Sequence, residues 1–437
     1  MPTAAVDSSR NREVLSNVLR NLRRLLTGKV VSALLQLLAM LLMARTLAPE
    51  QFGLVVLLHS YMLVWGGVFN CKPFEAIIRY GVPALENNDH QKLLRLLKLG
   101  ILVDVCTSLG ATVLAVACAG LIGQFLSWNH EFVGFAQLYS LVLLTGMTGT
   151  AKGILRLYNR FDLLSTQLAI APIIMCIGSG IAWQKELGMP AFIVTWWLAI
   201  LLERLYLILK GLRELKNQIP ETSVFEVKTG DWRSEFAGVA GFTNVIYWQS
   251  NLDLIPRHGA SLLVGLLLGP AAAGLYKLAR SVAAILSAPA VLLRQVLFPD
   301  LTRIWNRGDS GFYWILAKTA TGAALLGLIF VVVAVIFGEQ LLEKLAGAEY
   351  TSAAIVMSWL LIAATLDLCS SILRSAAYAM GNAGKVLQLN LTAMLVYLLS
   401  FIVATTWIGL AGPGIAATSA STMTFAGMLL LVSRKRQ

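Results

Sequence analysis

The sequence predicts an all-α integral membrane protein with about twelve transmembrane helices in two parallel six-helix repeats. Three observations predict this fold. The 437 residues are 57% hydrophobic and only 13% charged, whereas soluble domains carry roughly 25% charged residues. Apolar runs long enough to cross a bilayer, which takes about 20 residues, recur along the whole chain. A short motif near the start of the chain also returns half a chain later.

The repeated motif is Leu47–Leu54 (LAPEQFGL), which returns as Leu268–Leu275 (LGPAAAGL). Each copy lies between two apolar segments and predicts a tight hairpin, because Pro fits the first turn of a helix and Gly lets helices approach closely. A second echo, Ile154–Arg156 and Ile372–Arg374, keeps the same order and nearly the same spacing. In transporters, parallel repeats of this kind form two lobes around a central cavity.

The hydropathy pattern divides the chain into four parts. A cytoplasmic tail, 1–27, contains an amphipathic segment expected to lie on the membrane surface. A first six-helix bundle, 28–209, is joined by a cytoplasmic linker, 210–235, to a second bundle, 236–437. The spans are expected at 29–46, 52–69, 97–125, 132–153, 163–183 and 190–209, then at 236–267, 271–299, 313–337, 352–378, 385–407 and 412–432.

The seventh of these spans, 236–267, is the most polar. It is interrupted by Asn251, Asp253, Pro256, Arg257 and His258. Such a segment is tolerated at membrane depth where the backbone is buried in protein or lines water, so the two alternatives are a broken helix and a helix that lines water.

Basic residues gather in alternate loops of the predicted topology. They occupy segments such as 70–98, 152–160 and 204–233 and the tail 434–436, whereas the opposite loops contain few. The positive-inside rule therefore places both termini in the cytoplasm, which requires an even number of spans. The net charge of +12 belongs to these loops, and no nucleic-acid-binding motif accompanies it, so no nucleic-acid partner is expected.

Metal and cofactor sites are not predicted. The five cysteines and four histidines form no metal-ligand spacing, and most of the cysteines lie within apolar spans. The chain also contains no Walker sequence and no Ser/His/Asp set, so it is not expected to be an enzyme.

Basic residues inside predicted spans are the candidate substrate-binding groups, because a charge in the bilayer is costly unless it faces water or a partner. In the eighth span, Lys277 and Arg280 share a polar face with Ser281, Ser287 and Arg294. Arg374 lies in the tenth span, and Arg156 closes the fourth. The alternative for Lys277 and Arg294 is snorkelling to the two surfaces, and for Lys152 and Arg156 a role as membrane anchors.

Three acids inside spans are candidates for ion coupling: Asp104, Asp253 and Asp367. For Asp367 an ion pair with Arg374, two turns along the same helix, is an equally good alternative. Glu203 closes the sixth span beside Arg204 and is expected to be a paired surface charge. Arg45 at the end of the first span is expected to snorkel to the surface.

A cavity with more Lys and Arg than acid attracts anions, and guanidinium groups suit phosphate oxygens well. The pattern of intramembrane charges therefore favours a substrate that carries phosphate or pyrophosphate over a cationic drug.

Several motifs resemble the polysaccharide-transporter family of O-antigen and exopolysaccharide flippases. They are Gly28-Lys29, Ala44–Gly53 (ARTLAPEQFG) and Leu268–Ala279 (LGPAAAGLYKLA). Val296–Leu301 (VLFPDL) resembles the motif that closes the eighth helix of this family. The likeness covers the full length in span number and order, and the wider superfamily includes lipid II flippases and multidrug extruders.

This resemblance implies twelve helices in two lobes, a cationic central cavity, and export of undecaprenyl-diphosphate-linked oligosaccharide to the outer leaflet of the bacterial inner membrane. By position, the cavity would be lined by the faces that bear Lys277, Arg280 and Arg374. One position departs from the family: Ala260 stands where many members have an acid, and the nearest acid, Asp253, lies further back.

The predicted function is therefore a flippase for lipid-linked oligosaccharide in surface polysaccharide biosynthesis, working by alternating access. Its expected partners are that substrate, membrane lipids, and the polymerase and glycosyltransferases of the same pathway. Two alternatives stay open. One is a multidrug or toxin extruder of the same fold, and the other is a membrane-embedded polysaccharide polymerase or ligase.

Overall fold

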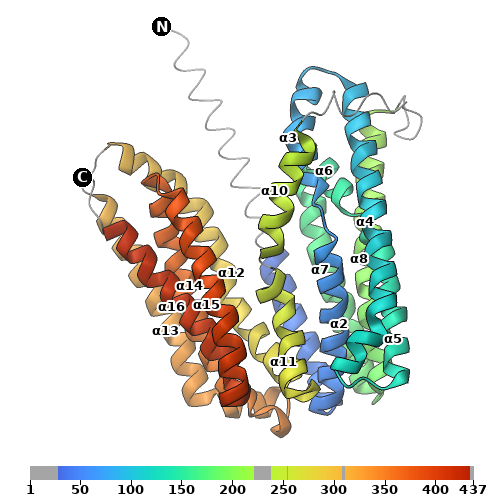
Figure 1. Ribbon diagram of the computed structural model, residues 1–437, viewed down its shortest axis with the longest axis vertical. Coiled ribbons are helices and arrows are strands. Elements are labelled where there is room, and N and C mark those ends of the chain that lie inside the picture. The colour runs from blue at the N-terminus through green and yellow to red at the C-terminus, as the bar shows by residue number, and fades with distance from the viewer. Residues whose placement is uncertain (1–27, 221–237, 253, 308–310, 434–437) are drawn as a thin grey trace. The chain divides into compact units, whose positions relative to one another are not determined.

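The computed structural model describes residues 28–220, 238–252, 254–307 and 311–433. Every regular element in these ranges is helical (Figure 1). Nine of the described helices are long and apolar enough to cross a membrane. The predicted fold class, an all-α membrane protein of about twelve spans, is confirmed.

The chain folds into two compact units whose boundaries fall inside helices. The first unit contains Leu58–Gly178 and Pro190–Gly259, together with the first span as far as Gln36. The second contains Leu37–Leu57, Ser179–Met189 and Ala260–Gln437. The hairpin of the first sequence repeat therefore packs with the second unit.

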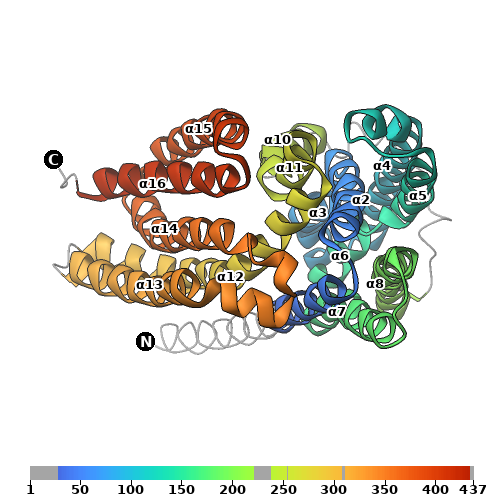
Figure 2. The ribbon, with the colours of Figure 1, turned by 90° about the horizontal axis from the view of Figure 1, so that it is seen from below.

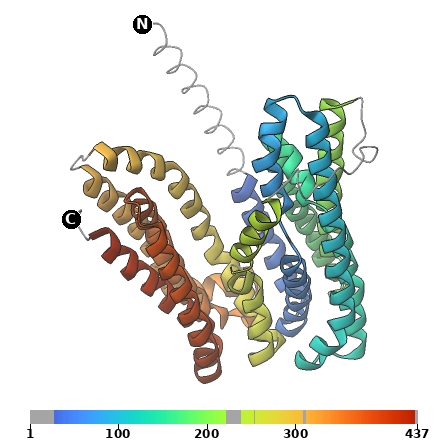
Figure 3. The same ribbon diagram turned by 45° about the horizontal axis from the view of Figure 1, so that its top comes forward.

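The first unit is built mainly from seven helices. In chain order they are α3 (Pro73–Glu86), α4 (His90–Phe125), α5 (His130–Ser140), α6 (Gly149–Leu157), α7 (Phe161–Gln184), α8 (Met189–Gln218) and α10 (Val239–Leu252). α4 has 36 residues, or about 54 Å at 1.5 Å per residue, and runs the length of the unit (Figure 3). Since bilayer hydrocarbon is about 30 Å thick, a large part of α4 must project from it.

The second unit includes the hairpin that joins the helix Gly28–Thr46 to α2 (Pro49–Val68). Its helices are α11 (Ala260–Leu268), α12 (Pro270–Arg307), α13 (Gly311–Leu345), α14 (Ala353–Ala379), α15 (Ala383–Ile408) and α16 (Gly412–Ser433). α14 lies in the middle, packed against α12, α13 and α16 (Figure 2). Its small residues, many of them Ala and Ser, let these neighbours approach closely.

The seventh span is not a regular α-helix throughout. A π-helical turn, Ile255–Gly259, separates α10 from α11. Pro256 lies in this turn and has no N–H to donate, which favours an irregular backbone at this point. Asp253 lies outside the described residues.

The fourth span is also broken, which the sequence analysis did not anticipate. A 3₁₀ segment, Leu141–Gly146, separates α5 from α6. Gly146 and Gly149 flank the break, and glycine disfavours a continuous helix at both positions.

The segment 70–98, expected to be a basic loop, instead contains α3 and the first turns of α4. Pro73 occupies the first turn of α3, where a missing N–H costs nothing. Asp89 caps α4, since its carboxylate accepts the Lys92 N–H at 2.9 Å. The face of α3 with Ala76, Ile77 and Ala84 is buried, so this basic segment carries an apolar stripe.

That stripe is part of a helical head at one end of the first unit. The head's buried core combines residues of α3, α4, α6 and the last turns of α8. α8 reaches Gln218, so the segment 210–235 begins with two helical turns that pack through Leu215 and Ile219.

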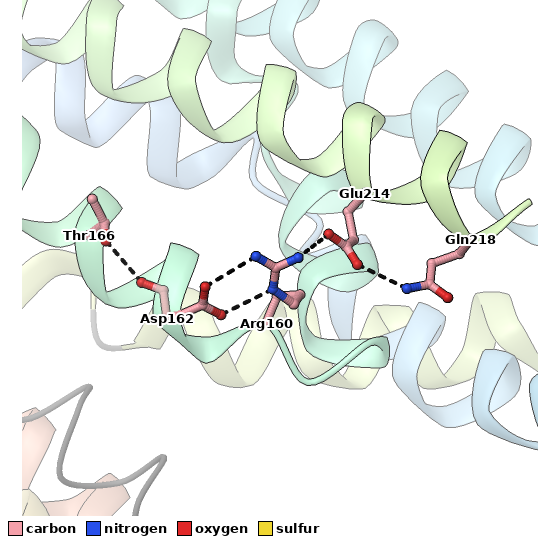
Figure 4. Close-up of polar contacts among 5 residues, drawn as sticks. All are labelled: Arg160, Asp162, Thr166, Glu214 and Gln218. Atoms are coloured by element: carbon pink, nitrogen blue, oxygen red, sulfur yellow. Dashed lines mark hydrogen bonds and ion pairs between the residues drawn. The ribbon is translucent and has the colours of Figure 1, made fainter. Parts of the chain in front are cut away.

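An ion network fastens the end of α8 to the start of α7 (Figure 4). The Arg160 guanidinium donates to Glu214, and to both oxygens of Asp162 at 3.2 Å. The Gln218 amide donates to Glu214 at 3.0 Å. The two hydrogen bonds to Asp162 hold the pKa of Arg160 above its usual range.

In the second unit the two repeated hairpins touch each other directly. A Cβ atom on Gly53 would collide with the carbonyl oxygen of Pro270. Reciprocally, a Cβ on Gly274 would lie 2.7 Å from the Phe52 ring. The repeated glycines are therefore the surfaces through which the two copies of the motif pack.

Side chains around the first hairpin tie it to the segment that follows α13. The Arg45 guanidinium donates to the carbonyl oxygens of Leu345, at 2.8 Å, and of Lys344. The Tyr350 hydroxyl donates to the Leu47 carbonyl at 2.9 Å, and its ring meets the Phe52 ring edge-on. Arg45 thus caps the carboxyl end of α13 and is itself exposed. Its snorkelling to the membrane surface stays a prediction.

We predict that Gly53→Val destabilises the protein by about 3 kcal/mol or more, because the added atoms meet backbone that cannot move aside. The measurement is the unfolding temperature of purified protein, followed by size-exclusion elution after heating. Gly322→Ala is the matched control, because a Cβ there meets open space and alanine favours the helix. Equal stability of the Gly53→Val variant and the wild type would contradict the close hairpin packing.

We predict that Arg160→Ala lowers the free energy of unfolding by about 1–3 kcal/mol, because the buried Glu214 carboxylate loses its cation. This loss of free energy is smaller than the loss expected when a fully buried ion pair is broken, because the Arg160 side chain is 38% exposed. Adding Glu214→Gln should recover much of the loss. Arg213→Ala, at an exposed position on α8, should leave the unfolding temperature unchanged.

Candidate functional site

A polar cavity of about 400 Å³ lies inside the first unit. Its walls come from the first span, α2, α4, α6, α7 and α8. Its lining contains four charged side chains, which are Asp104, Lys152, Glu203 and Arg204. The other polar residues of the lining are Ser32, Gln36, His59, Asn70, Thr107, Ser108, Thr148 and Gln167.

Asp104 is positioned at the amino end of α6. Its carboxylate accepts the Thr150 N–H at 2.7 Å, so a residue 46 positions away supplies the cap that this helix otherwise lacks. A Cβ on Gly149 would lie 2.7 Å from the Asp104 carboxylate, which explains the glycine at the start of α6. The same carboxylate also lines the cavity, so Asp104 caps α6 and faces the cavity at the same time.

Arg204 binds the backbone at the break in the fourth span. Its guanidinium donates to the carbonyl oxygen of Val142 at 2.8 Å. Val142 lies in the 3₁₀ segment, where carbonyls lack their α-helical partners. The arginine therefore satisfies a backbone group that would otherwise face hydrocarbon.

The neighbouring Glu203 accepts a hydrogen bond from the Gln167 amide on α7. Both Glu203 and Arg204 lie in the middle of α8, which continues for fourteen residues beyond Arg204. The expectation that they form a paired surface charge was wrong, because both side chains line the polar cavity inside the unit.

Lys152 balances the acids of the cavity. Glu203 and Asp104 attract its ammonium group, while Arg204 and Arg156 repel it. The cavity thus contains two cations and two carboxylates. This balance suits water or a ligand with both charges better than a simple cation or anion.

His59 closes the cavity on the side of α5 and α8. Its Nδ1 lies 3.0 Å from the Tyr139 hydroxyl, and its ring meets the Trp196 ring edge-on at 5.0 Å. The histidine is buried and held by aromatic neighbours, which fixes its orientation.

The second unit contains the predicted basic pair of the eighth span. Lys277 and Arg280 lie one turn apart on α12, and both are half-buried. Arg280 donates to the Tyr276 hydroxyl at 3.0 Å, and Tyr276 hydrogen-bonds Tyr397 of α15. The Arg280 guanidinium repels the ammonium group of Lys277, because both are cations. The side chains of Ser287 and Arg294 lie outside the described part.

Arg374 and Asp367 lie on α14 of the same unit. Asp367 is exposed, accepts a hydrogen bond from the Ser421 hydroxyl of α16 and is attracted by Arg374. Arg156 belongs to the first unit. It is exposed on α6, with its guanidinium 4.6 Å from the centre of the Phe74 ring.

Comparison with known proteins identifies the family. The family of polysaccharide biosynthesis proteins matches residues 42–355, which is more than half of the chain. The chain belongs to this family.

The chain is also similar to individual proteins and solved structures. Inner membrane protein YghQ of Escherichia coli (strain K12) is 28% identical over 353 residues, which cover 77% of this chain and 94% of YghQ. An inward-facing multidrug resistance MATE family transporter of the MOP superfamily matches with a TM-score of 0.71 and 12% identity, over 92% of this chain and 94% of that one.

The lipid II flippase MurJ in an inward closed conformation matches with a TM-score of 0.69 and 14% identity, over 92% of this chain and 86% of that one. At such low identity the solved structures establish a shared fold alone. The polysaccharide biosynthesis protein therefore has the fold of MOP-superfamily transporters, and it is a multi-pass membrane protein.

Sequence reasoning missed three of the residues that make the polar cavity: His59, Gln167 and Arg204. The sequence contained an indication for two of them. Arg204 is a charged residue on an uninterrupted helix that is otherwise apolar, and Gln167 is a polar residue in the middle of an apolar span. His59 gave no such signal, because a lone histidine on a helix is more often a packed core residue.

We predict that Asp104→Leu lowers the free energy of unfolding by about 2 kcal/mol, because the Thr150 N–H at the start of α6 loses its acceptor in a buried site. Asp104→Asn keeps an amide oxygen there and should change the free energy by less than about 1 kcal/mol. Thermal melts of both purified variants test this. Wild-type stability of the Asp104→Leu variant would show that the cap is dispensable.

Proposed function

We propose that this polysaccharide biosynthesis protein is a flippase that moves undecaprenyl-diphosphate-linked oligosaccharide from the inner to the outer leaflet. Family membership supports a transport role in polysaccharide biosynthesis. The observation that carries the proposal is the pair Lys277 and Arg280 on α12, two cations held side by side on a membrane helix.

Electrostatics supports an anionic substrate for this pair. Residues three apart on a helix are neighbours, and two like charges about 6 Å apart repel by on the order of 3 kcal/mol at an effective dielectric constant of about 20. Tyrosine hydroxyls from Tyr276 and Tyr397 stand beside the pair. A phosphate or diphosphate group would remove this repulsion and accept hydrogen bonds from both cations.

The chemistry of the substrate suits such a site. A diphosphate-linked sugar is too polar to cross hydrocarbon unaided, whereas its polyprenyl chain can stay in lipid throughout. In the proposed mechanism the two repeats alternate in access to the two sides of the membrane. Arg374 of α14 and Arg156 of α6 are the further cations proposed to meet the headgroup.

Ion coupling is proposed for the acids inside the spans. Asp104 lines the polar cavity and Asp367 accepts a hydrogen bond from Ser421, and Asp253 belongs to the same proposal from its sequence position. Binding of a proton or sodium ion at these groups would change the charge balance around Lys152 and Arg374.

The location proposed is the bacterial inner membrane, with both termini in the cytoplasm. The name of YghQ, an inner membrane protein, and the distribution of basic loops support it. The partners proposed are the lipid-linked substrate, the surrounding lipids, and the polymerase and glycosyltransferases that act on the same glycan.

We predict that Arg280→Ala and Lys277→Ala each lower glycan export at least tenfold, because each removes a charge-assisted contact with the diphosphate. Export is measured as surface glycan in cells that lack the chromosomal gene and express the variant. Lys318→Ala is the matched control, since Lys318 lies on α13 over the Trp314 ring. Membrane fractions should contain all the variants in equal amounts.

Normal export by both the Lys277→Ala and the Arg280→Ala variant would refute the proposal. Drug resistance in a sensitised strain that expresses the wild type would favour the multidrug extruder. Elongation of glycan chains by the purified protein would favour the polymerase.

A further inference from the structure

The first unit contains a second cavity whose chemistry differs from that of the polar one. It lies between α3, α4 and α10 and has a volume of about 610 Å³, within the range of ligand-binding pockets. Most of its lining is apolar and much of it small. The apolar lining residues are Pro73, Ala76, Ile77, Leu96, Leu99, Gly100, Val103, Gly238, Val239 and Ala240.

The length of this α3–α4–α10 groove suits one leaflet of a bilayer. α10 lines it from Val239 to Tyr247, nine residues or about 13 Å of helix. One leaflet contributes about 15 Å of the hydrocarbon layer. A single acyl chain of a phospholipid fits that length, whereas a long polyprenyl chain would extend far beyond it.

A cation stands at one end of the groove. Arg79 lies one turn beyond Ala76 on α3 and is exposed. Its guanidinium is 4.5 Å from the centre of the Phe242 ring of α10 and 5.6 Å from that of Tyr80. The contacts described for this guanidinium are cation–π contacts with aromatic rings, and they leave it the positive charge that a phosphate group would meet.

The position of this cation along the helices matches a lipid headgroup. Lys92, Arg95 and Lys98 occupy the first turns of α4, immediately before and beside the groove residues Leu96 and Leu99. A helix much longer than the hydrocarbon layer must leave the membrane at its charged end. The groove therefore starts at the level of the headgroups and leads into hydrocarbon on the basic side of the protein.

We propose that the α3–α4–α10 groove binds one acyl chain of an anionic phospholipid, with the phosphate of its headgroup held by Arg79. The guanidinium selects the negative charge of the headgroup, and the small apolar side chains accommodate the acyl chain. The site is independent of the basic pair on α12, so it does not depend on the proposed transport activity.

The test is native mass spectrometry of the purified full-length protein with added phosphatidylglycerol or phosphatidylcholine. The wild type should hold one phosphatidylglycerol at a concentration at which phosphatidylcholine is not retained. Arg79→Ala should raise the phosphatidylglycerol concentration needed for half occupancy about tenfold, the worth of one charge-assisted contact. Arg213→Ala, an exposed cation on α8, is the matched control and should have no effect.

A second variant tests the chain-binding part of the site. Ala240 is exposed in the groove wall, so Ala240→Trp fills the groove without changing the core and should abolish retention of the lipid. Val245→Trp, on the same helix and outside the groove, should retain it. Unchanged elution from size exclusion verifies folding of each variant.

Three results would overturn the proposal: equal retention of both lipids by the wild type, no effect of Arg79→Ala, or no effect of Ala240→Trp. Displacement of phosphatidylglycerol by undecaprenyl phosphate at lower concentration would also overturn it, and would assign the groove to the carrier lipid instead.

Discussion

Contact between two glycine-bearing hairpins is the constraint on which the second unit depends. Gly53 and Gly274 occupy equivalent positions of the repeated motif, and each lies where a side chain would displace the other hairpin. Helices in a membrane gain little from burying apolar surface, so close packing of small residues has to hold them together. The hydrogen bonds of Arg45 and Tyr350 act around this contact and fix the loops beside it. A motif that could be read as a mere leucine-rich coincidence is thus an interface.

The intramembrane charges divide into two classes once their contacts are known. Arg45, Asp104 and Arg204 each satisfy backbone groups at a helix end or a helix break, which is the cheapest use of a charge in a medium without water. Lys277 and Arg280 are two like charges one turn apart, and Arg280 donates to the Tyr276 hydroxyl. They are the charges proposed to meet a ligand.

Hydropathy was sufficient to predict the fold class and the approximate spans, since each follows from local composition. It could not predict the ends of α4 and α8, because a helix continues beyond the bilayer wherever its apolar face is buried, as Leu93 of α4 and Leu215 of α8 are in the core of the helical head. The polar cavity inside the first unit was not predicted. Asp104 was named as a candidate for ion coupling, but the sequence could not show that Gly149 and Thr150 lie beside it. Pairings between residues so far apart in the chain come from packing alone.

The helical head at the charged end of the first unit has a mechanical consequence. α4 and α8 enter the head without a hinge, and its core of α3, α4, α6 and α8 side chains is continuous with the spans below. Sinking this unit would drag the lysines and arginines of α4 into hydrocarbon, and raising it would expose the lipid-facing leucines to water. The unit is therefore held at a fixed depth in the bilayer. Any working stroke it makes must be a tilt or a turn about the membrane normal, not a piston movement across it.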